Sequence, residues 1–583
     1  MAGLSRTGAS KAQFGSDVVI DMIQALGIEY VALNPGASYR GIHDSLVNYA
    51  GDKPELILCN HEGIAVAVAH GYANASGRPM IAAVHDVVGL LNASERVYNA
   101  WLDQAPIIVI GGTGPVAADL RRPHGDWIHT ALVQGEAVRE FTKFDDQPFS
   151  VQGIIDSMLR AHEVATTAPK GPVYVCFDAG LQEDALAEPV FIPDVAAFPA
   201  IEHPQASAVT LERMAALLLD AEAPAIVVNR LGQQAAVDAL VTLAETLGAA
   251  VVEQGDLYNF PSRHPLNMTD GSSDVIKNAD VILALNIVDP QATFSVSDFS
   301  TRRPTPVVRD DVRIIDVTLR HYGIKSWGQA YGGMFPMAIV VSADVREVLP
   351  SLTALVVAGA EDGLRARAAE RTAQALARRA AQGERFAEVA ARTSDPVGLA
   401  FLAQQTWELI QDHDWTLLDR DLRGNWAHRL WDFTSAGQFT GTTKAGIGNG
   451  LGRAIGAGIA NRGSGKLQVH FQPDGDLLYT PSALWTLANQ ELPILVITNN
   501  NRSYGNDERH QEEVALTRER PVENKGVGIH IEGPDVDFAA MARSYGVHGE
   551  GPVTRAEDLR SALERALAVV LDGKPALVDV VTR

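Results

Sequence analysis

The stretch that decides the fold is residues 467–505, LQVHFQPDGDLLYTPSALWTLANQELPILVITNNNRSYG. Its first run, Leu467–Phe471, has the alternation of a strand, and Pro493–Thr498 is a short β-branched run of the kind that parallel sheets bury. The residues between these runs, Ser482–Ala488, favour a helix. The stretch therefore predicts a βαβ unit, which is the building block of a doubly wound α/β sheet.

Polar residues follow each of these two predicted strands. Pro473-Asp474-Gly475-Asp476 comes after the first strand, and residues 499–505 come after the second. Open α/β sheets bind ligands at the carboxyl ends of their strands, so we expect two loops of one site. A carboxylate of Asp474, the amide oxygen of Asn501 and the backbone carbonyl of Ser503 suit a hard cation that neutralises a diphosphate, which predicts Mg²⁺. Each string alone is typical of a solvated turn, and the prediction depends on their pairing.

The spacing of the two strings resembles the diphosphate and Mg²⁺ motif of thiamine diphosphate (ThDP) enzymes, which begins Gly-Asp-Gly and closes with Asn-Asn. Asn501 stands 27 positions after Asp474, which is close to the family spacing. Pro473 is a departure, because it occupies the place of the first glycine of the motif. Since the chelating aspartate is present, the resemblance implies that Asp474, Gly475 and Asp476 bind the cofactor and keep the metal.

The residues around Glu62 resemble the pyrimidine-binding domain of the same family. Leu58–Ala67 places Glu62 just after a predicted strand and at the entry of an apolar helix, where a carboxylate also simply favours the helix dipole. The turn Asn34–Gly36 and the string Gly71–Ala73 complete the resemblance. It implies that Glu62 hydrogen-bonds the pyrimidine ring and activates the cofactor, and that Gly36 lies at the cofactor.

A bulky apolar residue lies under the bent cofactor in this family. In Gly446–Gly452 that residue is Leu451, which stands 23 positions before Asp474. The alternative interpretation is an ordinary core leucine in a glycine-rich segment. The register relative to Asp474 is what favours a cofactor-binding role for Leu451.

The order of the segments predicts three doubly wound parallel-sheet domains. Strand-like runs alternate with helical segments in residues 1–185, the pyrimidine-binding domain, and again in residues 205–350, a middle α/β domain. Residues 395–583 form the diphosphate-binding domain, after an Ala-, Arg- and Glu-rich helical connector at 360–391. The resemblance therefore covers almost the whole chain, in the order found in benzoylformate decarboxylase, pyruvate decarboxylase and acetolactate synthase.

The substrate is less well determined than the cofactor. Residues 83–89 and 260–265 are similar to segments of benzoylformate decarboxylase, and His85 follows a strand end, so we expect it to act as an acid or base. The opening turn Pro35–Ser38 looks more like that of acetolactate synthase. We therefore expect cleavage or formation of a carbon–carbon bond next to the carbonyl of a 2-oxo acid, by a decarboxylase or by a carboligase.

A polar segment follows the predicted metal loop. Residues 506–510 begin a helix by their polarity. Asp507 falls where pyruvate decarboxylase has an active-site glutamate, and His510 lies one turn further on, so both are expected to face the substrate. A charged, solvated helix face is an equal alternative.

Composition narrows the class of partner. A formal net charge of −23 over 583 residues argues against nucleic acid and anionic membranes, and we expect a small carbonyl substrate and a cytoplasmic location. The two cysteines end apolar runs and are expected to be buried and inert. The family resemblance implies a homodimer or homotetramer with active sites between subunits. FAD in the middle domain is left open and not favoured.

A function of a different class also has support. Pro473 in the metal motif and Ala37 in the opening turn would suit a catalytically silent ThDP-fold protein that acts as a binding or regulatory partner. The joint presence of Glu62, Asp474 and Asn501 argues against it, because a silent protein has no chemical need of that trio.

Overall fold

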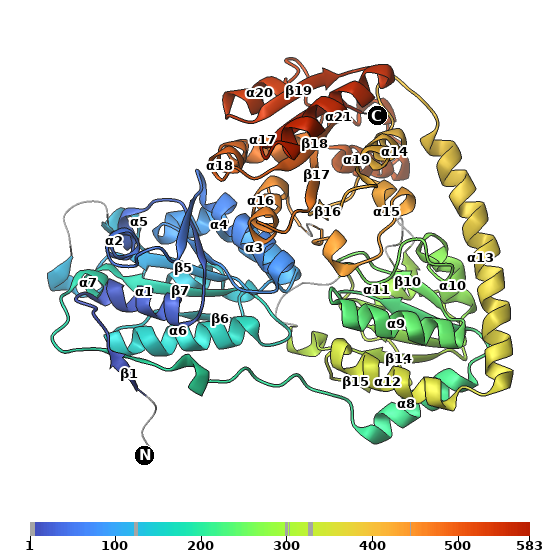
Figure 1. Ribbon diagram of the computed structural model, residues 1–583, viewed down its shortest axis with the longest axis horizontal. Coiled ribbons are helices and arrows are strands. Elements are labelled where there is room, and N and C mark those ends of the chain that lie inside the picture. Colours follow the sequence, from blue (N-terminus) through green and yellow to red (C-terminus); the bar gives the residue numbers. More distant parts are fainter. Residues whose placement is uncertain are drawn as a thin grey trace.

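In a computed structural model the chain forms three parallel β-sheets, one after another along the sequence, with the last sheet at the top of Figure 1. The structure describes residues 6–121, 126–297, 301, 303–323, 330–442 and 445–582. Helices lie on both faces of each large sheet. This arrangement confirms the predicted fold class of three doubly wound α/β units.

The first sheet has six parallel strands in the order β3-β2-β4-β5-β7-β6. Helices α1 (Gly15–Ala25), α2 (Arg40–Asn48) and α6 (Val151–Thr166) pack on one face of it. Helices α3 (Glu62–Ser76) and α4 (Asp86–Leu102) pack on the other face. The strands are β2 (Tyr30–Leu33), β3 (Glu55–Leu58), β4 (Ile81–Ala83), β5 (Ile108–Thr113), β6 (Phe144–Asp146) and β7 (Val173–Asp178).

The middle sheet has five parallel strands in the order β10-β9-β11-β14-β15. Helices α8 (Ala208–Asp220), α9 (Gln234–Leu247) and α12 (Val345–Gly359) cover one face, and α10 (Ser272–Asn278) packs on the other. The strands are β9 (Pro224–Val228), β10 (Ala250–Glu253), β11 (Val281–Leu285), β14 (Arg313–Val317) and β15 (Ile339–Val341).

The last sheet also has five parallel strands, in the order β16-β17-β18-β20-β19. Helices α14 (Leu399–Ile410) and α21 (Ala556–Leu571) pack on one face, and α16 (Gly450–Ala460), α18 (Ala483–Asn489) and α20 (Phe538–Ser544) pack on the other. The strands are β16 (Trp415–Leu418), β17 (Leu467–Pro473), β18 (Ile494–Asn500), β19 (His548–Val553) and β20 (Ala576–Val581). The predicted βαβ unit is present, because β17 and β18 pair in parallel.

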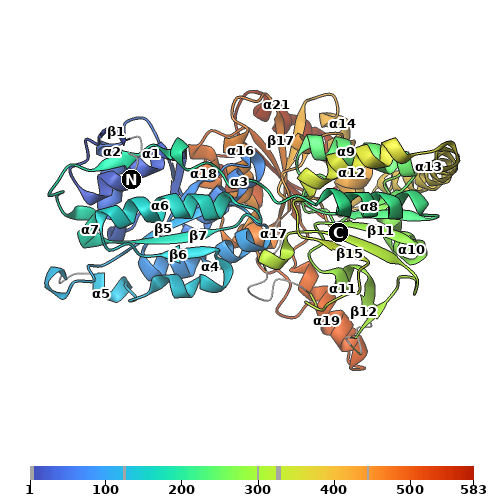
Figure 2. The same ribbon diagram turned by 90° about the horizontal axis from the view of Figure 1, so that it is seen from below.

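A long helix joins the middle and last units. Helix α13 (Asp362–Ala390) runs along one side of the molecule, at the right edge of Figures 1 and 2. A few residues on one side of it, such as Leu364 and Ala375, are buried, and most of its charged residues are exposed. The helix is therefore the solvated connector that the composition predicts, and one apolar core runs from the middle unit into the last.

The first and last units meet through two closely packed helices, α3 and α16. A Cβ atom at Gly71 would overlap the carbonyl oxygen of Arg453, and one at Gly456 would overlap that of Val68. Only glycine allows the two helix backbones to approach this closely. Because Glu62 starts α3 and Leu451 is the second residue of α16, this packing fixes the starts of two predicted site helices relative to each other.

Two further expectations concern burial. Cys59 and Cys176 are both buried, as predicted, and burial raises the pKa of each thiol to about 12. Among the helices that the structure describes, none combines the length and the apolar character that a bilayer crossing requires.

Candidate active site

Strands β17 and β18 end at the same edge of the last sheet, with Pro473 opposite Asn499. The expected loop at Pro473–Asp476 is wrong in form, because helix α17 (Asp474–Tyr479) starts directly after β17. The physical reason is that Asp474 and Asp476 both fall in the first turn of a helix, where unpaired N–H groups favour carboxylates. The short helix still leaves the Asp474 carboxylate at the edge of the sheet.

Three oxygen atoms converge beside Asp474. The side-chain oxygen of Asn501 lies 3.0 Å from Oδ1 of Asp474 and 2.9 Å from the main-chain oxygen of Ser503. Turning the Asn501 amide would replace these contacts by two hydrogen bonds. However, oxygens about 3.0 Å apart are also the neighbouring ligands of an octahedron whose metal–oxygen distance is about 2.1 Å, the value that Mg²⁺ requires. The donor set, one carboxylate and two neutral oxygens, therefore fits a hard divalent cation.

The Asp474 carboxylate lies in a buried environment. Its side chain is buried, and burial raises the pKa of its carboxyl to about 6, while main-chain N–H groups, including that of Gly475, act in the opposite direction. A Cβ atom at Gly475 would lie 2.7 Å from the ring of Tyr504, which explains the glycine beside the carboxylate. We call Asp474, Asn501 and Ser503, with Gly475, the Asp474 half-site.

Asp476 has a different task from Asp474. Its Oδ1 accepts a hydrogen bond from the N–H of Gly448 at 2.9 Å, and its Oδ2 accepts one from the N–H of Gly450 at 3.1 Å. The Gln472 side chain donates to Oδ2 as well, at 2.9 Å. Asp476 is thus occupied in holding the segment that leads into Leu451, whose buried side chain packs in the core that α3 and α16 share.

Glu62 is the first residue of α3. The preceding residue, His61, caps the helix through its Nδ1, and Asn92 of α4 donates to Oε2 of Glu62 at 3.2 Å. The Glu62 side chain is nearly buried. A Cβ atom at Gly89 would lie 2.9 Å from Oε1 of Glu62 and 2.9 Å from Cβ of His85, so the two candidate catalytic residues flank this one glycine.

His85 lies between β4 and α4. Its Nδ1 is 3.1 Å from Oγ of Ser38 and 3.0 Å from Oδ1 of Asp86, and its ring meets that of His129 edge-on at a centroid distance of 4.9 Å. Gly36 packs against the His85 ring, because a Cβ atom there would lie 2.8 Å from both Cγ and Nδ1 of that ring. The structure thus brings Gly36, Glu62 and His85 together, and with Gly89 we call them the Glu62 half-site.

Arg96 connects the first unit to the glycine-rich segment of the last unit within one chain. Arg96 of α4 lies against Gly63, the second residue of α3, and its guanidinium donates to the carbonyl oxygens of Ile447 and Gly448 at 3.2 and 3.3 Å. Gly448 is in turn held by Asp476. Arg96 therefore joins the start of α3 to the segment that precedes Leu451.

Asp507 and His510 lie on α19 (Gly505–Thr517), and both side chains are exposed. Neither side chain forms a hydrogen bond or an ion pair with a described residue. The side chain between them, Glu508, points back and accepts a hydrogen bond from Oγ of Ser503 at 2.9 Å. The roles of Asp507 and His510 at a substrate stay predictions.

Several residues around the half-sites are not among the sequence predictions. Gly89, Asn92 and Arg96 follow His85 on one face of α4, at the helical spacing of three and four residues, which is a signal that the sequence carries. His129 is separated from His85 by 44 positions, and no motif connects the two rings. Only the fold brings His129 to the site.

Two family models match the chain at the two ends that carry the half-sites. The model described as thiamine pyrophosphate enzyme, N-terminal TPP binding domain, matches residues 14–133. The model described as thiamine pyrophosphate enzyme, C-terminal TPP binding domain, matches residues 423–580. The first range contains Glu62 and His85, and the second contains Leu451, Asp474 and Asn501.

Similar proteins cover nearly the full chain. A benzoylformate decarboxylase of Pseudomonas aeruginosa is 26% identical over 97% of this chain and 98% of its own length. A probable chloroplastic acetolactate synthase 2 of Oryza sativa subsp. japonica is 25% identical over 97% of this chain and 82% of its own length. Among solved structures, the benzoylformate decarboxylase from Polynucleobacter necessarius superimposes with a TM-score of 0.75 at 16% identity, over 98% of this chain and 99% of that chain.

Proposed function

Because this chain belongs to the thiamine diphosphate-dependent enzymes, we propose that it uses ThDP and Mg²⁺ to break or form the carbon–carbon bond next to the carbonyl of a 2-oxo acid. The relatives named above include a decarboxylase and a synthase that share this cofactor family, which supports the 2-oxo acid as the class of substrate. The chain is proposed to contain a pyrimidine-binding domain at 1–185, a middle domain at 205–350 and a diphosphate-binding domain at 395–583.

One observation carries the proposal, the convergence of three oxygens in the Asp474 half-site. The side-chain amide of Asn501 lies 3.0 Å from Oδ1 of Asp474 and 2.9 Å from the main-chain oxygen of Ser503, which is about the spacing of neighbouring ligands around Mg²⁺. These three residues would hold Mg²⁺, and Gly475 would leave room for the diphosphate beside them.

When bound, ThDP supplies a carbanion that adds to the carbonyl carbon and then accepts the electrons of the broken bond. The residues of this chain would bind the cofactor, orient it and transfer protons. Glu62 would exchange a proton with the pyrimidine ring, because it is nearly buried and its Oε2 is already oriented by Asn92. Leu451 would support the cofactor from below, since its place at the start of α16 is fixed by Asp476 and by the packing of α3 against α16.

His85 would move protons at the substrate. Ser38 and Asp86 orient its ring through Nδ1, and the adjacent His129 offers a second ring that can hold a proton. Asp507 and His510 would reach the substrate only from the exposed face of α19. Of these candidates His85 has the strongest structural support, because it shares Gly89 with Glu62.

The assembly is proposed to be a homodimer or homotetramer with its active sites between subunits. Two large side chains support this: Leu91 and Tyr479 are more than half exposed, and they lie on α4 and α17, the helices that carry Gly89 and Asp474. A second copy of the chain would remove them from water. Light scattering on the purified protein, with and without ThDP and Mg²⁺, measures the assembly directly.

The first test is calorimetric titration of the apo protein with ThDP, with and without Mg²⁺, followed by a screen of 2-oxo acids for CO₂ release. Binding that needs Mg²⁺, together with CO₂ release, is the expected result. Binding without CO₂ release would favour a carboligase or a lyase acting on a donor that is not an acid. No binding would overturn the proposal and favour a silent member of the fold.

The choice between decarboxylase and carboligase needs a separate assay. With pyruvate in excess, a decarboxylase releases acetaldehyde and a carboligase forms acetolactate, so quantifying both products in one reaction separates the two. The opening turn Pro35–Ser38 supports the carboligase, while His85, placed beside Glu62, supports the protonation step that a decarboxylase needs.

A further inference from the structure

A buried carboxylate, Asp103, connects all three units of the chain. It directly follows α4 of the first unit as the C-cap residue, and its side chain has no exposure to solvent. Arg230, which follows β9 of the middle unit, donates to its Oδ1 at 2.8 Å and also to its main-chain oxygen. Arg453, in α16 of the last unit, donates to its Oδ2 at 3.1 Å. Asp103 is thus a charged contact common to the three units.

The contacts continue from Arg453 toward the cofactor site. Nε of Arg453 lies 3.2 Å from Oδ1 of Asp419, and Oδ2 of Asp419 lies 3.2 Å from Nε of Arg420. Arg420 then reaches Oδ1 of Asp476 at 3.4 Å. Asp476 holds the N–H groups of Gly448 and Gly450, which flank the start of α16 and Leu451. A continuous series of ion pairs therefore runs from the middle unit to the segment under the predicted cofactor.

We call Arg230, Asp103, Arg453, Asp419, Arg420 and Asp476 the ion-pair series. Acidic and basic members alternate in it, three of each, so every internal charge is compensated on both sides. Burial by itself would raise the pKa of Asp103, but Arg230 and Arg453 outweigh it and hold that pKa well below the usual range. Because buried charges are costly when unpaired, removing one member weakens the placement of its neighbours.

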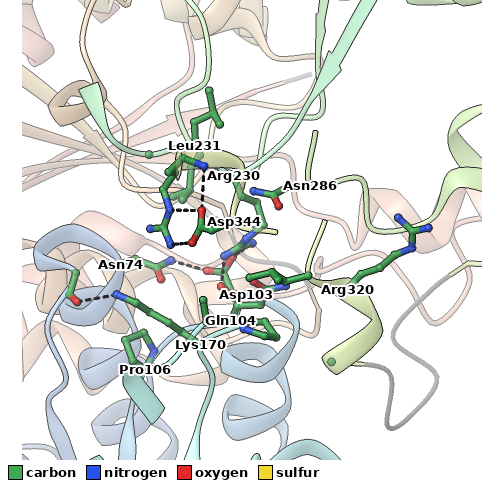
Figure 3. A pocket seen from close by; sticks show the side chains of 18 of the residues that line it. Asn74, Asp103, Gln104, Pro106, Lys170, Arg230, Leu231, Asn286, Arg320 and Asp344 are labelled. Atoms are coloured by element: carbon green, nitrogen blue, oxygen red, sulfur yellow. Dashed lines mark hydrogen bonds and ion pairs between the residues drawn. The ribbon is translucent and has the colours of Figure 1, made fainter. Parts of the chain in front are cut away.

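Arg230 is the member that belongs to the middle unit. Its backbone φ is 59°, a left-handed conformation that residues other than glycine rarely adopt. The N–H of Leu231 donates to the Asn259 side chain and the N–H of Gly232 donates to the carbonyl of Tyr258, and these two hydrogen bonds hold the turn. The residue lines a cavity of about 390 Å³ between the middle sheet and the ends of α3 and α4. Figure 3 shows Asp103 in the wall of this cavity, with Asn74 beside it and Arg320 further along.

We propose that Arg230 and Asp103 are positioning residues of the active site, which act through Arg453, Asp419, Arg420 and Asp476 on the segment 445–452 that carries Leu451. Neither residue touches the half-sites. The inference rests on the proposed function, because it assigns the middle unit a part in cofactor binding. It also gives that unit a task that does not require a ligand of its own.

The test compares two matched variants, Arg230→Met and Arg320→Met. Arg320 lines the same cavity and pairs with a fully buried carboxylate, Asp316, at 2.5 Å, but it lies outside the ion-pair series. Hydrogen exchange followed by mass spectrometry on the apo proteins reports the peptide that covers 445–452. ThDP titration in the presence of Mg²⁺ reports the assembled site.

In Arg230→Met we expect exchange in 445–452 to be about tenfold faster and ThDP binding about tenfold weaker, the size of coupling that networks of this kind transmit. Arg320→Met is expected to leave both unchanged. Unchanged exchange and affinity in Arg230→Met would overturn the proposal, and so would equal changes in Arg320→Met. Because His70, Asn74 and Arg453 still bind Asp103, we expect the variant to fold.

A second, more conservative variant keeps the test informative if Arg230→Met does not fold. Arg230→Lys keeps a charge at Asp103 but loses the two-point contact, and we expect exchange and affinity between those of wild type and Arg230→Met. If neither variant folds, Arg230 is required for folding and the positioning role is wrong. Failure of the proposed function looks different: the wild type would not bind ThDP at all, while the exchange of apo variants would still report on the ion-pair series.

Discussion

The two half-sites are built on opposite principles. In the Glu62 half-site the two candidate catalytic side chains are oriented by polar neighbours: Asn92 donates to Oε2 of Glu62, and Ser38 and Asp86 lie against Nδ1 of His85. In the Asp474 half-site the side-chain oxygen of Asn501 faces two other oxygens. This difference indicates different chemistry for the two half-sites. Side chains oriented by hydrogen bonds, as in the Glu62 half-site, are suited to proton transfer, whereas neighbouring oxygen ligands, as in the Asp474 half-site, are suited to binding a cation.

The half-sites nevertheless occupy the same place in their sheets. Gly36, Glu62 and His85 follow β2, β3 and β4, which are neighbours in the first sheet, and Asp474 and Asn501 follow the neighbouring strands β17 and β18. Both sites thus lie at the carboxyl edge of a parallel sheet, where doubly wound folds bind ligands. The fold sets the position, and the side chains decide between proton and cation chemistry.

The largest expected effect comes from Glu62→Gln, which removes the proton-exchanging group and keeps its shape. We expect exchange of the C2 proton of bound ThDP to slow by about a thousandfold, within the usual range for loss of an acid–base group, while ThDP affinity remains. Proton NMR in deuterated buffer measures the exchange. Glu29→Gln, at a surface position, is the control. If exchange in Glu62→Gln is as fast as in wild type, Glu62 is not the activating group.

Asp474→Asn tests the other half-site with the opposite pattern. The substitution weakens a metal ligand, so we expect Mg²⁺-dependent ThDP affinity to fall by about a hundredfold. Loss of a residue that only hydrogen-bonds a metal ligand already lowers metal affinity by about 10- to 100-fold. Calorimetric titration over a range of Mg²⁺ concentrations measures it, with the exposed Asp572→Asn as the control. A variant that binds ThDP as tightly as wild type would show that the three oxygens of this half-site do not hold the metal.

The sequence predicts the sheets better than it predicts their edges. The predicted strands at Leu467–Phe471 and Pro493–Thr498 are present as β17 and β18. The short edge strands β6, with the polar sequence Phe-Asp-Asp, and β15 are absent from the prediction, because an edge strand needs few apolar residues and pairs on one side only. The helix that starts at Asp474 is missed as well. An Asp-Gly pair is typical of a turn, so the sequence gives no local signal of a helix there.

The candidate site divides in the same way. Motifs that lie close together in the chain, such as Asp474 and Asn501 or the turn at Gly36, are found from spacing. His129 is not, because it reaches the site from a separate element and carries no motif. On α19 the sequence favours Asp507 and His510 as site residues, yet Glu508 is the residue that contacts Ser503. Position 508 lies one helical turn after Tyr504, the N-cap residue of the helix, and its side chain therefore points back toward the start of α19.

Gly89→Ala would test whether the Glu62 half-site depends on close packing. The new Cβ atom would lie 2.9 Å from both Oε1 of Glu62 and Cβ of His85, so at least one of these two site residues must shift. We expect turnover to fall by about tenfold, because small displacements of catalytic groups are costly, with Mg²⁺-dependent affinity little changed. The split between kcat and ThDP affinity is the measurement. A fall in affinity with normal turnover would contradict the assignment.

Gly475→Ala is the matched change in the Asp474 half-site, and its expected effect is the smallest. The new Cβ atom would lie 2.7 Å from the ring of Tyr504, but this ring is only partly buried, whereas a Cβ atom at Gly89 would press directly on Glu62 and His85. We therefore expect ThDP affinity to fall by only about threefold, or less than 1 kcal/mol, with C2 exchange in the bound state unchanged. If Gly475→Ala instead slowed C2 exchange and left affinity intact, the two half-sites would not divide proton and cation chemistry as proposed.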